Sequence, residues 1–175
     1  HRVGTTVHVA IDGVYAGHIV ISDEIKQDAA KAIRQLKAEG VEKTVMLTGD
    51  AKAVGESVAK ELGLDEVYTQ LLPADKVEKV EQLLNHRQGN GKLAFVGDGI
   101  NDAPALMRAD IGVAIGAGTD IALDSADVIL MKSSLLDVVT AIDLSSDVIK
   151  NIKMNLFWAF FYNILGIPVA TGLLY

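Results

Sequence analysis

The sequence predicts an α/β protein in which a parallel β-sheet carries helices on its faces and a transmembrane helix follows at the C-terminal end. Short β-branched runs alternate with amphipathic stretches between Val7 and Leu130, which is typical of such a sheet. Half of the 175 residues are apolar, enough to bury one substantial core. No charged residue occurs after Lys153.

Hydrophobic spacing defines the elements of the first half. Two β-branched runs flank the sequence GVYA and predict a hairpin, and two later runs predict strands at residues 44–48 and 66–69. Helices are predicted between and after these strands because apolar residues recur there at helical spacing. The residues concerned are Ala29, Ile33 and Leu36 before Gly40, then Val54, Val58 and Leu62 before Gly63, then Val77, Val80 and Leu84 after Pro73.

The second half continues the alternation. A turn-rich loop at residues 86–92 leads to a predicted strand at 92–97, and a brief helix is expected from Ala103. Two further strands are expected at residues 111–115 and 127–131, with the segment TDIALDSA between them. This part completes a domain predicted to comprise residues 1–145.

The C-terminal segment, residues 146–175, is expected to be a linker helix that runs into a transmembrane helix. Met154–Tyr175 has about the roughly 20 residues needed to cross a bilayer core. Lys150 and Lys153 precede it, which predicts a cytoplasmic position for the preceding domain. The alternative is a buried core helix or a helix that docks on a partner.

Composition excludes some classes of function. The formal net charge of −7 and the lack of a basic stripe argue against nucleic-acid binding. The chain has no cysteine, so it offers neither disulfides nor thiolate metal ligands. Because it begins with His1 and no secretory leader follows, we expect it to be a piece of a longer polypeptide.

Three motifs stand where predicted strands end and helices begin, which is where open α/β sheets bind ligands. Thr48–Asp50, with the sequence TGD, precedes a helix N-terminus and offers an anion site, although an ordinary N-cap turn would look the same. Lys76 lies one turn into a helix and can reach a phosphate oxygen, although a solvated lysine is the alternative.

The third motif, GDGINDAP, is the most informative, because a structural turn does not need so many oxygen-bearing side chains. Asp98 can bind Mg²⁺ through its carboxylate, since this hard cation prefers carboxylates, waters and phosphates. Asn101 can donate to a phosphoryl oxygen, and Asp102 can orient both groups.

The strings MLTGD, LLPADK and VGDGINDAPAL, in this order, resemble the phosphorylation domain of P-type ATPases, membrane pumps whose catalytic core has the haloacid-dehalogenase-like fold. The resemblance implies Mg²⁺ as cofactor, and ATP bound mainly by a domain outside this chain. It implies that Thr48, Gly49 and Asp50 hold the phosphoryl group and that Lys76 neutralises it. Asp98 then corresponds to the magnesium ligand, and Asn101 and Asp102 to the pair that completes the site, with Asp102 also at the magnesium.

The family's nucleophile is an aspartate in an Asp-Lys-Thr-Gly-Thr motif, which does not occur in this sequence. The family places that motif upstream, so we expect that the chain alone forms no phosphoenzyme, since the attacking carboxylate is missing. The implied partners are the rest of the pump, namely its nucleotide, actuator and other membrane segments, together with the transported heavy-metal ion and the membrane.

The transported ion is predicted from the last segment. Asn155, Tyr162, Asn163 and Pro168 resemble the seventh membrane helix of the copper-exporting branch, in which the tyrosine and asparagine face the ion. Polar groups at membrane depth tend to line an ion path, although Tyr162 as an interfacial anchor and Asn163 as a contact between helices are alternatives. The early part of the chain looks closer to zinc and cadmium exporters, so copper(I) is preferred and zinc or cadmium comes next.

The sequence is compatible with two other functions. A soluble phosphatase of the same fold would need its own aspartate nucleophile, for which Asp12 is the candidate, although its context suits a hairpin turn. A non-enzymatic domain that completes an ATPase in trans is the third possibility.

Overall fold

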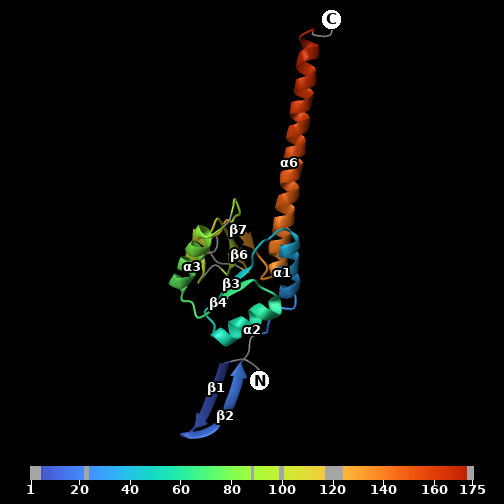
Figure 1. Ribbon diagram of the computed structural model, residues 1–175. Helices are drawn as coiled ribbons and strands as arrows, with labels where there is room; N and C mark the ends of the chain where they lie inside the picture. The colour runs from blue at the N-terminus through green and yellow to red at the C-terminus, as the bar shows by residue number, and fades with distance from the viewer. Residues whose placement is uncertain (1–4, 22–23, 88, 99–100, 117–123, 173–175) are drawn as a thin grey trace. The chain divides into compact units, whose positions relative to one another are not determined.

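The computed structural model describes residues 5–21, 24–87, 89–98, 101–116 and 124–172, and Figure 1 shows the order of the elements. The chain divides into two compact units, residues 1–138 and 139–175, which are described separately. The strands are β1 (Thr5–Ile11), β2 (Val14–Ile21), β3 (Val45–Leu47), β4 (Glu66–Tyr68), β5 (Ala94–Gly97), β6 (Ile111–Ile115) and β7 (Val128–Leu130). The helices are α1 (Ala29–Ala38), α2 (Lys52–Leu62), α3 (Pro73–Asn85), α4 (Ala103–Arg108) and α6 (Leu135–Ala170).

Strands β1 and β2 form the predicted antiparallel hairpin, but its connection is shorter than expected. Only Asp12 and Gly13 lie between the strands, both with positive φ, 48° and 79°. An Asp-Gly pair with this backbone matches the twist of a two-residue hairpin turn. The rest of GVYA therefore belongs to β2, which contains an irregularity opposite Val9 and Ala10.

The remaining strands are parallel, which confirms the predicted α/β class. Strand β3 pairs with β4, and β5, β6 and β7 form a second sheet in that order. Each of these strands follows a helix or leads into one, as the alternating sequence predicts. Within the described residues β3 and β5 each pair with one strand only.

The core lies where short helix α4 packs on the second sheet. Leu106 of α4 and Ala114 of β6 are fully buried, with Phe95 and Ala126 packed against them. A side chain at Gly112 of β6 would meet the Leu106 carbonyl oxygen at 2.7 Å, so only glycine lets α4 approach this closely. The predicted apolar faces of α1 and α3 are also inward, since Ala29, Ile33, Leu36 and Val80 are buried.

Helix ends follow the predicted signals. Gly63 closes α2 in the left-handed conformation, with φ of 70°, and the Leu64 N–H donates to the Ala59 carbonyl 3.0 Å away. Pro73 begins α3, and the Asp75 carboxylate accepts a hydrogen bond from the Leu72 N–H at 2.8 Å.

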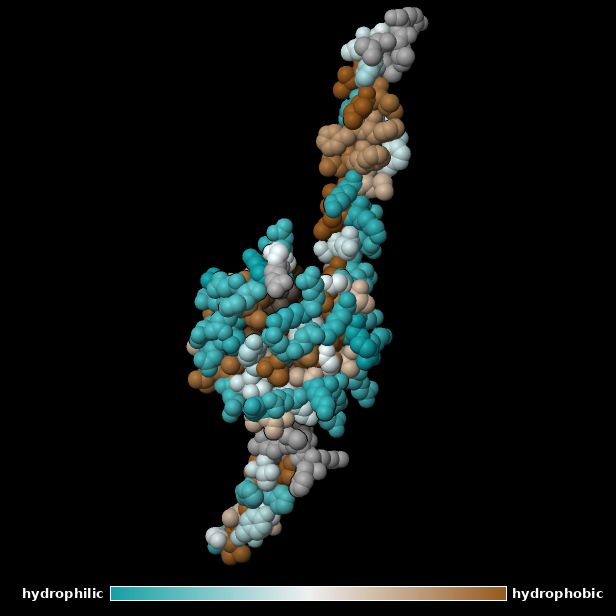
Figure 2. Space-filling view, in the orientation of Figure 1, coloured by the Kyte–Doolittle hydropathy of each residue, from teal (hydrophilic) through white to brown (hydrophobic). Residues whose placement is uncertain are grey.

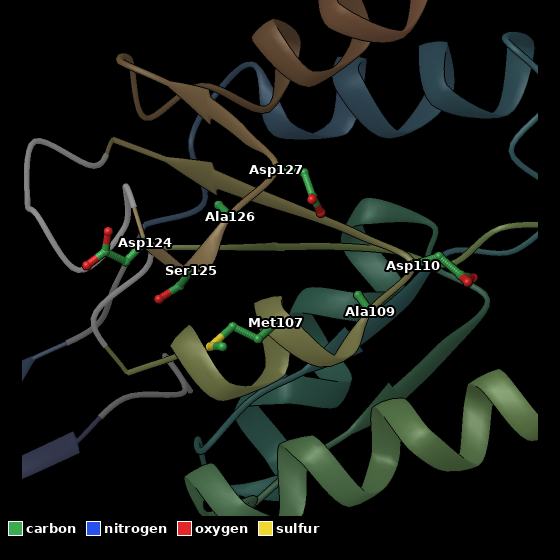
Figure 3. Close-up of a pocket in the computed structure, with 7 residues that line it drawn as sticks. All are labelled: Met107, Ala109, Asp110, Asp124, Ser125, Ala126 and Asp127. Carbon is green, nitrogen blue, oxygen red and sulfur yellow. The ribbon is translucent and has the colours of Figure 1, made fainter.

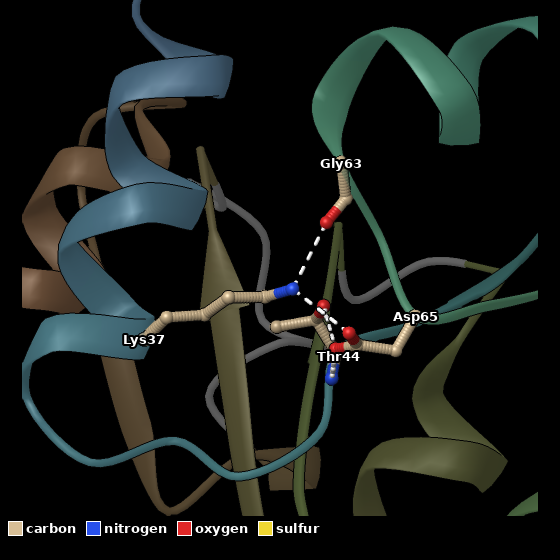
Figure 4. A network of polar contacts seen from close by, with 4 residues as sticks. All are labelled: Lys37, Thr44, Gly63 and Asp65. Carbon is tan, nitrogen blue, oxygen red and sulfur yellow. Dashed lines mark hydrogen bonds and ion pairs between the residues drawn. The ribbon is translucent and has the colours of Figure 1, made fainter.

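A polar cluster joins α1, the end of α2 and the segments that lead into β3 and β4 (Figure 4). Asp65 accepts hydrogen bonds from the Thr44 hydroxyl at 2.6 Å and the Thr44 N–H at 2.7 Å. Lys37 of α1 reaches both Asp65, at 2.8 Å, and the Gly63 carbonyl, at 3.0 Å. These contacts fix the start of the β3–β4 pair against α1.

The second unit consists of most of α6, a continuous helix of 36 residues. Every residue from 143 to 167 is exposed, and the helix surface carries many apolar side chains in its C-terminal half (Figure 2). The expected transmembrane helix is not supported, because among the described residues no helix combines the length and the apolarity that a bilayer crossing needs. The polar residues Asn155, Tyr162 and Asn163 interrupt the apolar run.

Candidate functional site

The Thr48–Asp50 turn lies between the carboxyl end of β3 and the start of α2. The Thr48 hydroxyl donates to the Asp50 carboxylate at 2.8 Å, and the Asp50 N–H lies 3.1 Å from the same hydroxyl oxygen. Gly49 is exposed, and a side chain there would meet the Leu71 carbonyl at 3.3 Å. The turn is therefore compact and internally hydrogen-bonded, and the exposed Gly49 lies just before a helix N-terminus.

Backbone hydrogen bonds tie this turn to the segment that carries the second motif. The Leu71 N–H donates to the Thr48 carbonyl at 3.1 Å, and the Gln70 N–H donates to the Asp50 carbonyl at 2.9 Å. Helix α3 begins two residues later, and Lys76 lies in its first turn. The first two motifs are thus held together by residues 70 and 71.

Lys76 and Asp102 form an ion pair, with 2.7 Å between Nζ and Oδ1. Their side chains are only 18% and 15% exposed, so the pair is largely shielded from water. A charge-assisted hydrogen bond in such surroundings is stronger than one on the surface. The second and third motifs, which lie on α3 and at the start of α4, are therefore in direct contact.

The third motif is shaped by Gly97, the last residue of β5. A Cβ atom at this position would lie 2.8 Å from both Cβ and Oδ2 of Asp102, so the absence of a side chain lets Asp102 lie against the strand. Asp98 follows directly, and Asp98 and Asn101 are exposed. Gly99 and Ile100 lie outside the described residues.

The structure thus connects several residues of the predicted site. Asp102 pairs with Lys76 through Oδ1, and its Cβ and Oδ2 lie close to Gly97. Its expected roles, to orient its neighbours and to share the magnesium ion, stay predictions. This ion pair was missed by sequence reasoning, because a contact between α3 and α4 leaves no local pattern. Gly97 is the one local feature of the sequence that could have indicated the close approach of Asp102 to the end of β5.

The residues present fit a magnesium ion that keeps most of its own water. Mg²⁺ is held in such sites by one or two carboxylates together with water and phosphate oxygens, not by a full protein cage. Asp98 supplies an exposed carboxylate at a strand end. Among the described residues, no group of three or more His, Cys, Asp or Glu side chains is placed to hold a metal ion.

A pocket of about 280 Å³ lies elsewhere and contains none of the predicted residues (Figure 3). Its lining includes Asp110 and Asp127, which precede β6 and β7 and so lie at the amino ends of these strands. Asp110 accepts a hydrogen bond from the Leu93 N–H, and this bond and the nearby Arg87 hold the pKa of its carboxyl below the ordinary value. The Asp127 carboxylate accepts from the Gly112 N–H at 2.8 Å. These carboxylates are occupied in structural contacts.

The two residues predicted to face the transported ion lie on α6. Tyr162 is 68% exposed and its ring lies 5.9 Å from that of Trp158. The Asn163 amide donates to the Ala159 carbonyl, one turn earlier, at 2.9 Å. Both residues belong to the second unit, whereas Lys76 and Asp102 belong to the first.

Comparison with known proteins identifies relatives over nearly the whole chain. The copper-transporting ATPase 1 of Rhizobium meliloti (strain 1021) is 51% identical over 169 residues, which cover 97% of this chain and 20% of that protein. The zinc-transporting ATPase of Synechocystis sp. (strain ATCC 27184 / PCC 6803 / Kazusa) is 50% identical over 169 residues, 96% of this chain and 23% of that protein.

A solved structure of a heavy-metal ATPase also matches nearly the whole chain. The crystal structure of a zinc-transporting PIB-type ATPase in the E2.Pi state matches with a TM-score of 0.80 and 42% identity. The match covers 97% of this chain and 27% of that chain, so the present chain spans about a quarter of this relative.

The family of haloacid dehalogenase-like hydrolases matches residues 2–110, which include all three motifs. The chain therefore belongs to the haloacid dehalogenase-like hydrolases, and it matches the phosphorylation domain of heavy-metal P-type ATPases.

Proposed function

We propose that this chain is the part of an ATP-driven heavy-metal export pump that holds the transferred phosphoryl group and its magnesium ion. The observation that carries the proposal is the contact of 2.7 Å between Lys76 and Asp102, which is largely shielded from water. Asp102 holds the Lys76 ammonium group at the start of α4, which follows the strand end where Asp98 lies. Phosphoryl transfer depends chiefly on such positioning and charge neutralisation.

Each residue then has a defined role. Thr48 and Gly49 bind phosphoryl oxygens through the hydroxyl and the backbone N–H. The Thr48 hydroxyl, which donates to the Asp50 carboxylate in this structure, would turn its one proton to a phosphoryl oxygen, while the Asp50 N–H holds the hydroxyl oxygen in place. Lys76 places its positive charge at the same group, with Asp102 fixing its position, and Asn101 donates to a further oxygen. Asp98 holds the magnesium ion, which supplies additional neutralisation of phosphoryl charge when bound.

The nucleophile would come from the rest of the pump, which also contributes the nucleotide and actuator domains. Strands β3 and β5 both belong to parallel sheets, and among the described residues each has one edge without a partner strand. We propose that a strand bearing the aspartate motif pairs with these free edges of β3 and β5. Its carboxyl end would then lie at the same edge as Thr48 and Asp98, because parallel strands end together.

The C-terminal region would serve the membrane part of the pump. We propose that residues 1–145 form the cytoplasmic portion, and that 146–175 lead into the membrane region and pack against its other helices. Exposed apolar side chains on α6 support this, since a surface of that kind marks an interaction site. Tyr162 and Asn163 would face the ion, for which copper(I) is favoured and zinc or cadmium comes next, in line with the copper- and zinc-transporting relatives.

The phosphate site is tested by titrating the chain with inorganic phosphate in the presence of Mg²⁺ and following amide resonances. We expect shifts at residues 48–50, 76 and 98. Lys76→Met, Thr48→Val and Asp98→Asn should each weaken binding at least about tenfold, because one preorganised contact of this kind contributes roughly 3 kcal/mol. Lys52→Met, which alters an exposed lysine, is the control. Shifts spread over other surfaces would contradict the site.

The pump assignment is tested by incubating the chain with labelled ATP and, separately, with p-nitrophenyl phosphate. We expect no incorporation and no turnover until a fragment bearing the aspartate motif is added, after which labelled protein should appear. Hydrolysis of p-nitrophenyl phosphate by the chain alone would instead support a phosphatase. Asp12, the candidate nucleophile of that alternative, lies in the hairpin turn between β1 and β2.

A further inference from the structure

The hairpin carries two histidines that face each other across its strands. His8 of β1 and His18 of β2 are direct partners in the antiparallel register, and the centroids of their rings are 6.0 Å apart. Directly opposed side chains lie on the same face, with Cβ atoms about 4.5–5.5 Å apart. Both residues are exposed, so neither imidazole is explained as part of a core.

A bulge in β2 adds Tyr15 to this face. Val9 pairs with Gly17 whereas Ala10 pairs with Tyr15, so Ala16 is the extra residue. Without it, positions 15 and 18 would point to opposite faces, because side chains alternate along a strand. With it, the Tyr15 hydroxyl oxygen lies 3.0 Å from Nδ1 of His18, and its ring lies 6.0 Å from that of His8.

We propose that His8 and His18 form a binding site for a divalent transition-metal ion, with Tyr15 as the positioning residue. When Nδ1 of His18 donates its proton to the Tyr15 oxygen, Nε2 carries the lone pair that a metal needs. Metal-bound histidines commonly use the second ring nitrogen in this way, which fixes the tautomer and the ring orientation. Water completes the coordination of the ion.

The ligand chemistry selects the class of ion. Imidazole nitrogen suits Cu²⁺, Ni²⁺ and Zn²⁺, at bond lengths of about 2.0–2.1 Å for zinc, and is a poor ligand for Mg²⁺. Affinity should follow the usual order, with Cu²⁺ bound more tightly than Zn²⁺. The proposed histidine site therefore differs from the proposed magnesium site both in its residues and in the ion that it binds. An experiment that disproves one of the two sites leaves the other untouched.

The test uses the full chain, freed of metal by a chelator and carrying His1→Ala, so that the terminal imidazole adds no ligand. Zn²⁺ and Cu²⁺ are titrated by competition with a chromophoric chelator. We expect one equivalent to bind. His8→Ala and His18→Ala should each lower the affinity at least tenfold, and Tyr15→Phe should lower it by about tenfold with the stoichiometry kept. His86→Ala is the matched control, since His86 is exposed and its Nδ1 is also held, by the Gln82 carbonyl.

A second measurement needs no substitution in the hairpin. Substoichiometric Cu²⁺ should broaden the amide resonances of residues 7–9 and 17–19 before those of any other region. Broadening centred elsewhere would overturn the proposal, as would equal losses of affinity in His86→Ala and His8→Ala. An unchanged affinity in both His8→Ala and His18→Ala would overturn it as well.

Discussion

Lys76 and Asp102 show how single residues connect the site. They are 26 positions apart in the chain, yet their side chains are in contact and shielded from water. Each side chain stabilises the other, because a charge that is shielded from water raises the free energy of the folded state when it has no partner of opposite charge. The pair therefore holds α3 against the start of α4 as well as placing a cation at the proposed phosphate site.

Replacing Lys76 should reveal this structural role. We expect Lys76→Met to lower the free energy of unfolding by about 1–3 kcal/mol, because the shielded Asp102 carboxylate loses its partner. Urea denaturation of the chain measures this. Lys52→Met, which breaks an exposed contact with Glu56 of 3.7 Å, should change the value by less than about 0.5 kcal/mol. Equal effects in the two variants would refute the argument from burial.

Substitution of Gly97 should destabilise the protein about as much as substitution of Lys76, because the Lys76–Asp102 ion pair needs the space that this glycine leaves. In Gly97→Ala the new methyl group would stand 2.8 Å from Asp102, so the carboxylate must move and the contact with Lys76 weakens. We expect a loss of about 1–3 kcal/mol in unfolding free energy, measured by urea denaturation. Gly166→Ala should cause no loss, because a Cβ atom there would meet nothing within 4 Å beyond its chain neighbours and the nearby backbone of its own helix. Tolerance of Gly97→Ala would mean that the close approach is not required.

At the scale of elements, polar contacts secure the ends of short strands. Strands β3 and β4 have three residues each, and Asp65 stands just before β4 with bonds to Thr44 and Lys37. The Lys37 ammonium and the Thr44 donors hold the pKa of the Asp65 carboxyl far below its ordinary value of 3.8. The folded state therefore favours the ionised form.

This shift predicts how stability depends on pH. A carboxyl group with a lowered pKa in the folded state stabilises the protein above its unfolded pKa, and the effect is lost as pH falls through about 4 and lower. We expect the free energy of unfolding to fall from pH 5 to pH 3 less steeply in Asp65→Asn than in the unaltered chain. Thr44→Val, which removes one donor, should lie between them. Parallel pH curves would contradict the assignment.

At the scale of the whole molecule, the chain combines a packed α/β unit with a long exposed helix. All residues from 143 to 167 are exposed, among them Phe157, Trp158 and Phe161, whose rings lie 5.5–6.0 Å apart. Aromatic and aliphatic surface of this extent is unfavourable in water. Such a helix is expected to associate with other apolar surface.

Shortening the chain tests this expectation. A chain ending at Lys150 should sediment as a monomer in detergent-free buffer, whereas the full chain should self-associate or require detergent. The thermal midpoint of the α/β unit should change little, because the removed residues up to 167 are exposed. Monomeric behaviour of the full chain without detergent, or a large drop in the midpoint on shortening, would refute this view of α6.

The sequence by itself determined the class of the fold, the order of the elements and the positions of the three motifs. Apolar spacing, Gly63 and Pro73 act locally, so their effect on helix faces and ends can be predicted without any partner. The family followed from the same local strings, and the match of residues 2–110 to the haloacid dehalogenase-like hydrolases, together with the heavy-metal ATPase relatives, confirmed it.

Only the tertiary structure decided which side chains meet. The Lys76–Asp102 pair, the contact of Asp102 with Gly97 and the opposition of His8 and His18 depend on packing and strand register between residues that are distant in the chain. The hairpin turn was shorter than expected because the Asp12–Gly13 backbone and the bulge at Ala16 set the pairing. Local patterns cannot specify such contacts, since they arise only when separate elements pack together.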